Sequence, residues 1–186
     1  MPASTTMTVI IARPVEDVFA VLSDVRNVPI WSSNTIEETL ITPGPLRKGS
    51  RRRAVVKGFE GRTMQNEAKM VEFEQDRRMV VEVLDAPVAA RIVIAFTAVD
   101  GGTRLDWTGI VSPRGILAPT APLITRFYRM MFEKDLRNLK ALMDRGELRR
   151  TFREQCRPLC NCACEVAGWT SRRRQANCAI NIRGPS

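Results

Sequence analysis

The five cysteines are the side chains best suited to metal or redox chemistry, and all of them lie near the end of the sequence. They follow the spacing Cys156-x3-Cys160-x-Cys162-x-Cys164-x13-Cys178. Zinc sites normally use C-x2-C or C-x4-C arms, which the crowded C-x-C-x-C segment does not match, although several thiolates could still gather a soft metal ion. Because the cysteine count is odd and a reducing cytoplasm is the expected compartment, disulfides are not expected. We predict no metal site and no cofactor.

Acid–base chemistry would have to proceed without imidazole, because the chain contains no histidine. This excludes Ser-His and Cys-His nucleophile pairs within the chain. The remaining candidates are Glu67, Glu82, Asp106 and Tyr128. Each alternates onto the solvent side of a predicted strand or onto a helix flank, so we expect solvated side chains. We therefore assign no catalytic residue, and a reaction here would work mainly by shaping its substrate and excluding water.

A run of three arginines, Arg51-Arg52-Arg53, follows closely after Arg47 and Lys48. One interpretation is a basic surface for an acidic partner, a phosphate-bearing lipid or RNA. The other, which we favour, is an exposed strand end whose charges discourage edge pairing. The sequence has no glycine-rich phosphate loop and no basic strand interleaved with aromatic residues, so no nucleic-acid partner is expected.

The positive charge is concentrated at the end of the chain. Of 186 residues, 29 are Lys or Arg and 20 are Asp or Glu, a net charge of +9. Residues 149–186 contain eight basic and two acidic residues, whereas residues 1–148 contain 21 and 18. We therefore predict one domain over 1–148 and a basic, cysteine-rich, disordered tail over 149–186. The chain lacks the run of roughly 18 apolar residues that a transmembrane segment needs and begins without a recognisable signal, so the cytoplasm is the expected location.

The first third of the chain predicts one strand and two short helices. Residues 5–12 are β-branched and apolar, and the strand they predict ends at Pro14. Apolar residues at helical spacing predict a helix from Pro14 to Leu22. A second short helix is expected over 25–34, and it carries Trp31.

The rest of the chain predicts six strands followed by one long helix. Asp100-Gly101-Gly102 between two alternating runs is a strong hairpin signal. The stripe from Ile124 to Met143 has helical spacing and predicts a helix of about 25 residues. The strands are expected over residues 37–42, 49–57, 62–74, 78–84, 91–99 and 103–111, and the helix over 123–147.

This order of elements predicts an α+β fold with an antiparallel sheet, because the strands are joined by tight turns. The seven strands need a cover for their apolar face, and only the C-terminal helix is long enough. A curved sheet that wraps around one helix rarely closes along its whole length. We expect the remaining space to form a cavity for a small ligand.

Several segments resemble the START-like or birch-pollen-allergen-like (SRPBCC) superfamily, and within it the polyketide cyclase/dehydrase and lipid-transport family. They are IIARPVEDVFAVLSD, a tryptophan seven residues after Asp24, AVDGGTRLDW and the long closing helix. The resemblance covers about residues 5–147. It implies a helix-grip fold, an interior cavity for an apolar or amphipathic ligand, no metal and no universal catalytic residue.

The expected ligand-binding residues are those placed on inward faces of the predicted elements. Asn66 is notable because it shares a strand face with apolar residues, and a buried amide needs partners. A filled core or a bond to a neighbouring strand would explain the same residues without a ligand. The set is Phe19, Trp31, Met64, Asn66, Met70, Val81, Val83, Ile94, Phe96, Trp107, Phe127 and Met131.

Three functions remain open at this point. The leading hypothesis is binding, and by extension transport, of a small hydrophobic ligand such as a lipid, a quinone or a polyketide-like molecule. The second is a polyketide cyclase or aromatase that uses the same cavity. The third is a coenzyme Q-binding or ribosome-associated interaction protein that uses the basic surface at Arg51–Arg53. The sequence does not define the oligomeric state.

Overall fold

The structure is a computed structural model that describes residues 3–57, 62–84, 88–113 and 119–148. All five cysteines lie outside the described residues, and so does the segment 149–186, for which the sequence predicts disorder. The domain predicted over 1–148 contains every described helix and strand.

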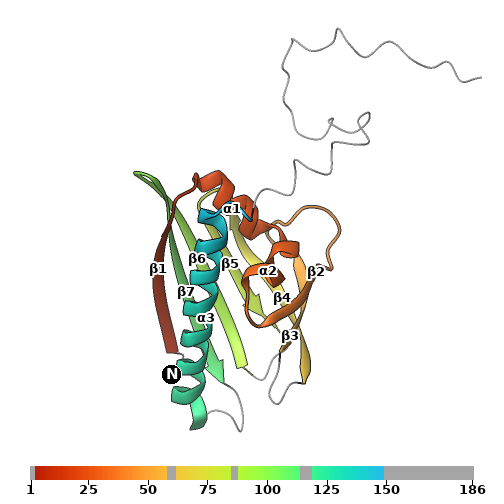
Figure 1. The fold of residues 1–186 in the computed structure, drawn as a ribbon. Helices are drawn as coiled ribbons and strands as arrows, with labels where there is room; N and C mark the ends of the chain where they lie inside the picture. Colours follow the sequence, from red (N-terminus) through yellow and green to blue (C-terminus); the bar gives the residue numbers. More distant parts are fainter. Residues whose placement is uncertain (1–2, 58–61, 85–87, 114–118, 149–186) are drawn as a thin grey trace, which may run out of the picture. The chain divides into compact units, whose positions relative to one another are not determined.

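Seven strands form one antiparallel sheet in the order β1-β7-β6-β5-β4-β3-β2. Neighbours from β2 to β7 follow one another along the chain, and β1 closes the row by pairing with β7. The predicted α+β class and antiparallel sheet are therefore confirmed (Figure 1). The strands are β1 Ala3–Ile11, β2 Thr35–Leu40, β3 Arg51–Lys57, β4 Thr63–Glu74, β5 Arg78–Val83, β6 Val88–Val99 and β7 Gly102–Pro113.

The connection from β1 to β2 contains the short helices α1 (Val15–Ser23), η1 (Val25–Asn27) and α2 (Val28–Trp31). The N-cap of α1 is Pro14, and the acidic residues of its first turn suit the positive end of a helix. The buried face of α1 follows the predicted spacing. The β6–β7 hairpin turns at Gly101, whose φ of 81° is accessible to glycine at little cost.

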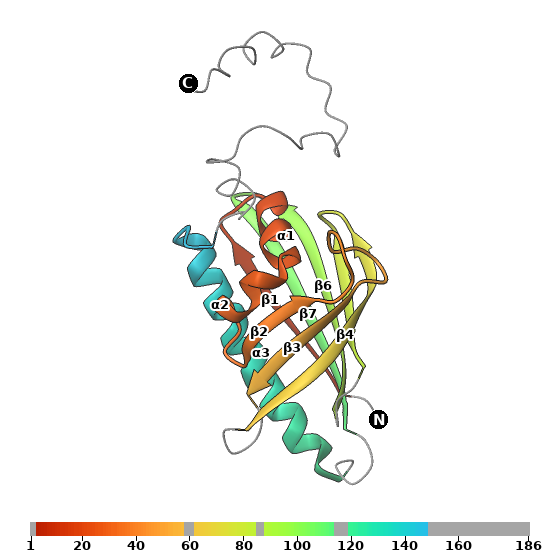
Figure 2. The same cartoon turned by 90° about the vertical axis from the view of Figure 1, so that its right-hand side faces the viewer.

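The long helix α3 (Ala121–Asp144) packs on one face of the sheet, along β1 and β7 (Figures 1 and 2). Phe132 of α3 lies directly over Gly109 of β7, where an added Cβ would come within 2.5 Å of the phenyl ring. Glycine at this position therefore lets the helix approach the sheet closely. The predicted long helix packed on the sheet is confirmed.

The two halves of α3 differ in burial. Leu136, Leu139 and Met143 in the C-terminal half are buried, as their helical spacing predicts. In the N-terminal half, Leu123, Phe127 and Met130 are exposed. We name these three residues the exposed stripe.

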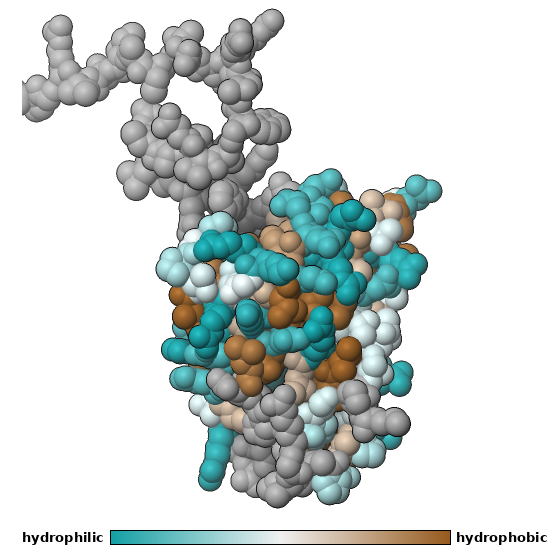
Figure 3. All heavy atoms as spheres, turned by 180° about the vertical axis from the view of Figure 1, so that it is seen from behind, coloured by the Kyte–Doolittle hydropathy of each residue, from teal (hydrophilic) through white to brown (hydrophobic). Residues whose placement is uncertain are grey.

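The outer face of the sheet is largely polar. Arg91 pairs there with Glu82, and Arg104 pairs with Asp106. Figure 3, which views the molecule from behind, shows apolar side chains in separate groups between hydrophilic ones. These charged pairs lie on the side of the strands that the sequence predicts to face solvent.

Candidate ligand-binding pocket

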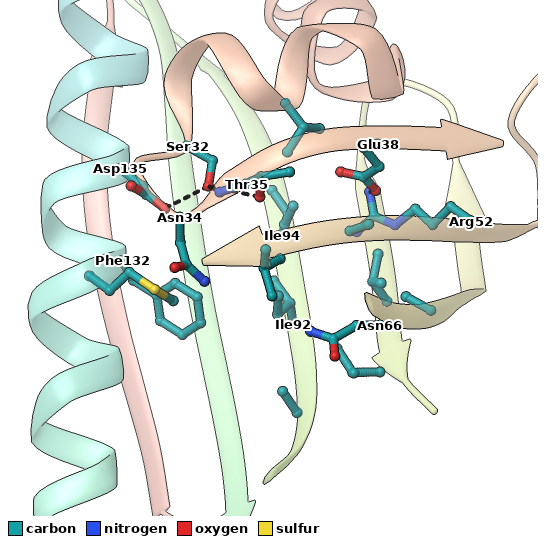
Figure 4. Close-up of a pocket in the computed structure, with 18 of the residues that line it drawn as sticks. Ser32, Asn34, Thr35, Glu38, Arg52, Asn66, Ile92, Ile94, Phe132 and Asp135 are labelled. Carbon is teal, nitrogen blue, oxygen red and sulfur yellow. Dashed lines mark hydrogen bonds and ion pairs between the residues drawn. The ribbon is translucent and has the colours of Figure 1, made fainter. Parts of the chain in front are cut away.

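A pocket of about 170 Å³ lies between the inner face of the sheet and the helices α2 and α3. Its walls are mostly apolar, and its polar residues lie in two groups (Figure 4). One group consists of Glu38, Arg52 and Asn66 on β2, β3 and β4. The other lies where α3 meets the loop after α2, with Asp135 and Ser32.

The first group follows directly from the strand register. Glu38 is paired with Ala54, and Ala54 with Asn66, so these three residues form one row across β2, β3 and β4. Side chains in such a row share a face of the sheet. Because alanine is small, the row leaves open space between the carboxyl of Glu38 and the amide of Asn66. Arg52, two residues before Ala54, extends from the same face.

Glu38 and Arg52 form an ion pair inside the pocket. Arg52 Nη1 lies 2.9 Å from Glu38 Oε1, and the side chains are 17% and 4% exposed, respectively. Burial raises the pKa of the Glu38 carboxyl above its ordinary value, and the charge of Arg52 opposes this rise. The pocket therefore contains one carboxyl that holds its proton more tightly than a solvated glutamate does.

The structure changes the interpretation of the run Arg51–Arg53, which was expected to be an exposed strand end. Arg51 and Arg53 point outward, and both pair with Glu67 on β4. Arg52 points inward instead, so the interpretation of the whole run as an exposed strand end is wrong for this residue. The reason is the two-residue period of a strand: once Ala54 faces inward, Arg52 must do the same.

Asp135 anchors the second polar group. It is only 5% exposed, and its carboxylate accepts hydrogen bonds from the backbone N–H of Ser33 at 2.7 Å and from Ser32 Oγ at 3.2 Å. Ser32 Oγ also lies 3.1 Å from Thr35 Oγ1. These bonds tie α3 to the segment between α2 and β2, which fixes that side of the pocket.

Four buried polar atoms of pocket residues have no hydrogen-bond partner among the described residues. Three belong to donors, namely the indole Nε1 of Trp31, the indole Nε1 of Trp107 and Nε of Arg52. The fourth is the acceptor Oδ1 of Asn66. Buried polar groups in proteins are nearly always paired. These four atoms have almost no accessible surface, so they are unsatisfied groups within the pocket wall rather than groups that the pocket exposes.

Three of the four acid–base candidates lie on the outer face of the sheet, and the fourth, Tyr128, lines the pocket. Glu67, Glu82 and Asp106 pair with arginines on the outer face, as predicted. A hydrogen bond from Arg53 lowers the pKa of Glu67, and one from Thr8 lowers that of Asp106. The expectation of a solvated side chain is wrong for Tyr128, because this residue lines the pocket and burial raises the pKa of its hydroxyl.

The structure brings most of the twelve predicted ligand-binding residues to this pocket. Phe19 and Phe96 instead pack together elsewhere in the core, with ring centroids 5.2 Å apart. Met64 and Phe127 are 40% and 62% exposed and do not line the pocket. The eight predicted residues that do line it are Trp31, Asn66, Met70, Val81, Val83, Ile94, Trp107 and Met131.

Sequence reasoning missed Glu38, Arg52 and Asp135. A signal for each was present, since each is a charged residue at an otherwise apolar position of its element. Glu38 lies between Ile36 and Leu40, which a regular strand would place on its own face. A bulge between residues 35 and 37 turns Ile36 outward and leaves Glu38 inside.

Within the described ranges, no group of three or more Cys, Asp or Glu side chains is arranged to hold a metal ion. No helix in those ranges is both long and apolar enough to span a membrane.

Fold and pocket together define an α+β protein of the helix-grip kind. The family model described as polyketide cyclase / dehydrase and lipid transport matches residues 2–144, and the chain belongs to this family. The resemblance inferred from the sequence is thus confirmed. None of the curated proteins compared with the chain matches it.

Solved structures share the fold at low sequence identity. A protein of Rhizobium leguminosarum is 20% identical with a TM-score of 0.59, and the match covers 78% of this chain and 96% of that one. A protein of Nitrosomonas europaea is 16% identical with a TM-score of 0.61, covering 77% and 96%. The di-domain ARO/CYC StfQ from the steffimycin biosynthetic pathway is 12% identical with a TM-score of 0.65, covering 78% and 51%.

Proposed function

We propose that the pocket binds a small hydrophobic or amphipathic molecule. The observation that carries this proposal is the pocket itself, whose mostly apolar walls include a few polar residues, among them Asn66 and the Glu38–Arg52 ion pair. Such a combination of apolar walls and a few polar groups is typical of small-molecule sites. The family description, which includes lipid transport, agrees with a ligand of this kind.

The volume of the pocket limits the size of this ligand. Pockets for drug-sized molecules measure about 300–1,000 Å³, whereas an engineered cavity of about 150 Å³ holds benzene. At about 170 Å³, this pocket suits a compound of one or two rings, or one segment of a longer chain. A complete lipid would have to leave most of its length outside.

Titration of the full chain with tetralin, a neutral two-ring hydrocarbon, tests this proposal. We expect amide and methyl NMR signals of pocket residues to shift on binding. Ala54→Leu fills the space between Glu38 and Asn66 and should abolish the shifts. Ala95→Leu is the matched control, because Ala95 pairs with Arg78 and Asp106 of the outer face. Equal binding by both variants, or no binding by the unmodified protein, would contradict the proposal.

A cyclase-type enzyme is the second candidate, and the Glu38–Arg52 pair favours it. A carboxyl with a raised pKa inside an apolar pocket can exchange protons with a bound substrate. Glu38 would remove a proton from the carbon next to a carbonyl, leaving an enolate that is reprotonated in turn. Deuterium exchange at carbon 2 of 1-tetralone in D2O measures this step. It should be faster with the protein than in buffer and return to the buffer rate with Glu38→Gln. Exchange no faster than in buffer would exclude this activity for the probe.

A further inference from the structure

We propose that the outward face of the N-terminal half of α3 binds an anionic lipid surface. The proposal concerns the outside of the molecule and does not depend on which ligand the pocket takes. It is carried by the exposed stripe and by the basic residues that share its side of the helix.

The exposed stripe is an apolar surface that no described element covers. Leu123, Phe127 and Met130 are 71%, 62% and 61% exposed, more than any other large apolar side chain among the described residues. Their spacing of four and then three residues places them on one side of the helix. Single exposed apolar residues are common on protein surfaces, whereas several on one face indicate a contact site.

Two further exposed apolar residues lie at the end of the sheet where α3 begins. Met64 is the second residue of β4, Leu84 directly follows β5, and they are 40% and 37% exposed. Because β4 and β5 are antiparallel neighbours, β4 starts where β5 ends, and Figures 1 and 2 show α3 beginning at that same end. The exposed apolar side chains at this end therefore come from three elements.

Basic residues share the outward face of α3. Arg126, Lys134 and Arg137 are exposed and follow the stripe at steps of three or four residues. None of the three has an acidic partner within the described part of the chain. The nearby carboxylate of Glu133 is already paired with Arg129, at 2.9 Å. The face thus combines apolar side chains with positive charge that no neighbour neutralises.

This charge decides between the possible occupants of the face. A second copy of the chain would bring the same cations against one another. Residues 149–186, with eight basic and two acidic residues, also have the same sign of charge. An anionic partner is therefore the complementary one. A lipid surface fits best, because it accepts separate apolar side chains from several elements without a shaped groove, while Lys and Arg reach the headgroups.

Cosedimentation of the full-length chain with lipid vesicles tests the proposal. We expect binding to vesicles of equal parts phosphatidylserine and phosphatidylcholine at low salt. Binding to pure phosphatidylcholine should be weaker by about a hundredfold, since each of the three cations contributes roughly fivefold. Added salt should weaken the binding to the mixed vesicles.

Two pairs of variants of the full chain locate the binding. Phe127→Gln should weaken it about tenfold, whereas Ile10→Thr, at a residue that is 54% exposed, should leave it unchanged. Arg126→Gln should weaken it about fivefold, whereas Arg77→Gln should leave it within about twofold. Both control residues are exposed and lie at the opposite end of the sheet.

A lipid that is spin-labelled in its acyl chain shows which part of the protein meets the bilayer. In nanodiscs of the same mixed composition, we expect the NMR signal of the Met130 methyl group to broaden. The methyl signal of Met143, which is buried near the other end of α3, should keep its width.

Four results would overturn the proposal. Absence of binding to the mixed vesicles would do so directly. Equal binding by Phe127→Gln and the unmodified chain would assign the affinity to another part of the chain. Binding to polyglutamate but not to vesicles would favour an acidic protein partner, and a dimer that Phe127→Gln dissociates would favour a second copy. None of these results bears on the pocket, which the tetralin titration tests separately.

Discussion

Two regions on the same inner face of the sheet are built from different side chains. Beneath α1, Phe19 packs against Phe73 and Phe96 with ring centroids 5.2 Å away in each case. We name these three residues the closed core. At the other region, the strands carry small residues such as Ala54 and Ala68 together with charged ones, and a pocket remains.

The difference shows that side-chain size along the strands, rather than the fold, decides where the hollow lies. Both regions have the same antiparallel backbone and a helix above it. Large rings fill one region, whereas alanine methyl groups leave space in the other. Among the described residues, four of the six buried polar atoms without a partner belong to residues that line this space, whereas none belongs to the three phenylalanines of the other region.

Truncation should affect the two regions unequally, and this is the largest effect we expect. Phe19→Ala removes a fully packed ring and should lower the free energy of unfolding by about 3–5 kcal/mol. Met131→Ala removes a half-buried side chain beside open space and should cost less than half as much. Urea denaturation measures both. Equal losses would mean that the pocket is packed as tightly as the closed core.

Breaking the buried ion pair should be nearly as harmful. Arg52→Ala leaves the carboxyl of Glu38 buried without its partner and should cost about 3 kcal/mol. Replacing both residues with Met should restore stability to within about 1 kcal/mol of the unmodified protein, because no charge then remains unpaired. A double variant as unstable as Arg52→Ala would show that the pair acts by more than mutual neutralisation.

Added bulk should have opposite effects in the two regions. Ala54→Leu fills empty space and should stabilise the protein by about 1 kcal/mol. Val18→Leu, at a fully buried position beside the closed core, should destabilise it by about 1–3 kcal/mol through overpacking. Thermal denaturation gives the sign of each change. A loss of stability in both would indicate that the pocket collapses around its walls.

The pH dependence of Glu38 should be the smallest effect. Its pKa is raised by burial, so its contribution to stability is fully present below the unfolded pKa of about 4.3 and is lost as the pH rises through the folded pKa. The stability of the unmodified protein relative to the double Met variant should therefore fall as the pH rises from 4, and then level off. Denaturation of both proteins at a series of pH values measures this difference. A relative stability that rises with pH would mean that Arg52 outweighs burial.

The fold was predictable because its signals are local and repeated. Prolines and glycines separate the strands, alternation marks the strand faces, and the stripe in α3 has helical spacing. Those signals also placed Asn66, Met70 and Trp107 on the inner face correctly.

The chemistry of the pocket was harder to predict for two physical reasons. The Glu38–Arg52 pair depends on the register of β2 against β3, which includes a bulge that the residue pattern does not predict. Phe127 has helical spacing with the core residues of α3, yet it is exposed. Spacing gives the face of a helix but not how far along its length a partner surface extends.

The most direct test of the account is to locate bound tetralin by intermolecular NOEs in the full-length protein. We predict contacts from its ring protons to side chains of Val81, Ile92 and Met131, which line the pocket, and none to Phe19 of the closed core. Contacts confined to the exposed stripe of α3, with none to the pocket, would contradict the claim that the hollow under the helix is the binding site.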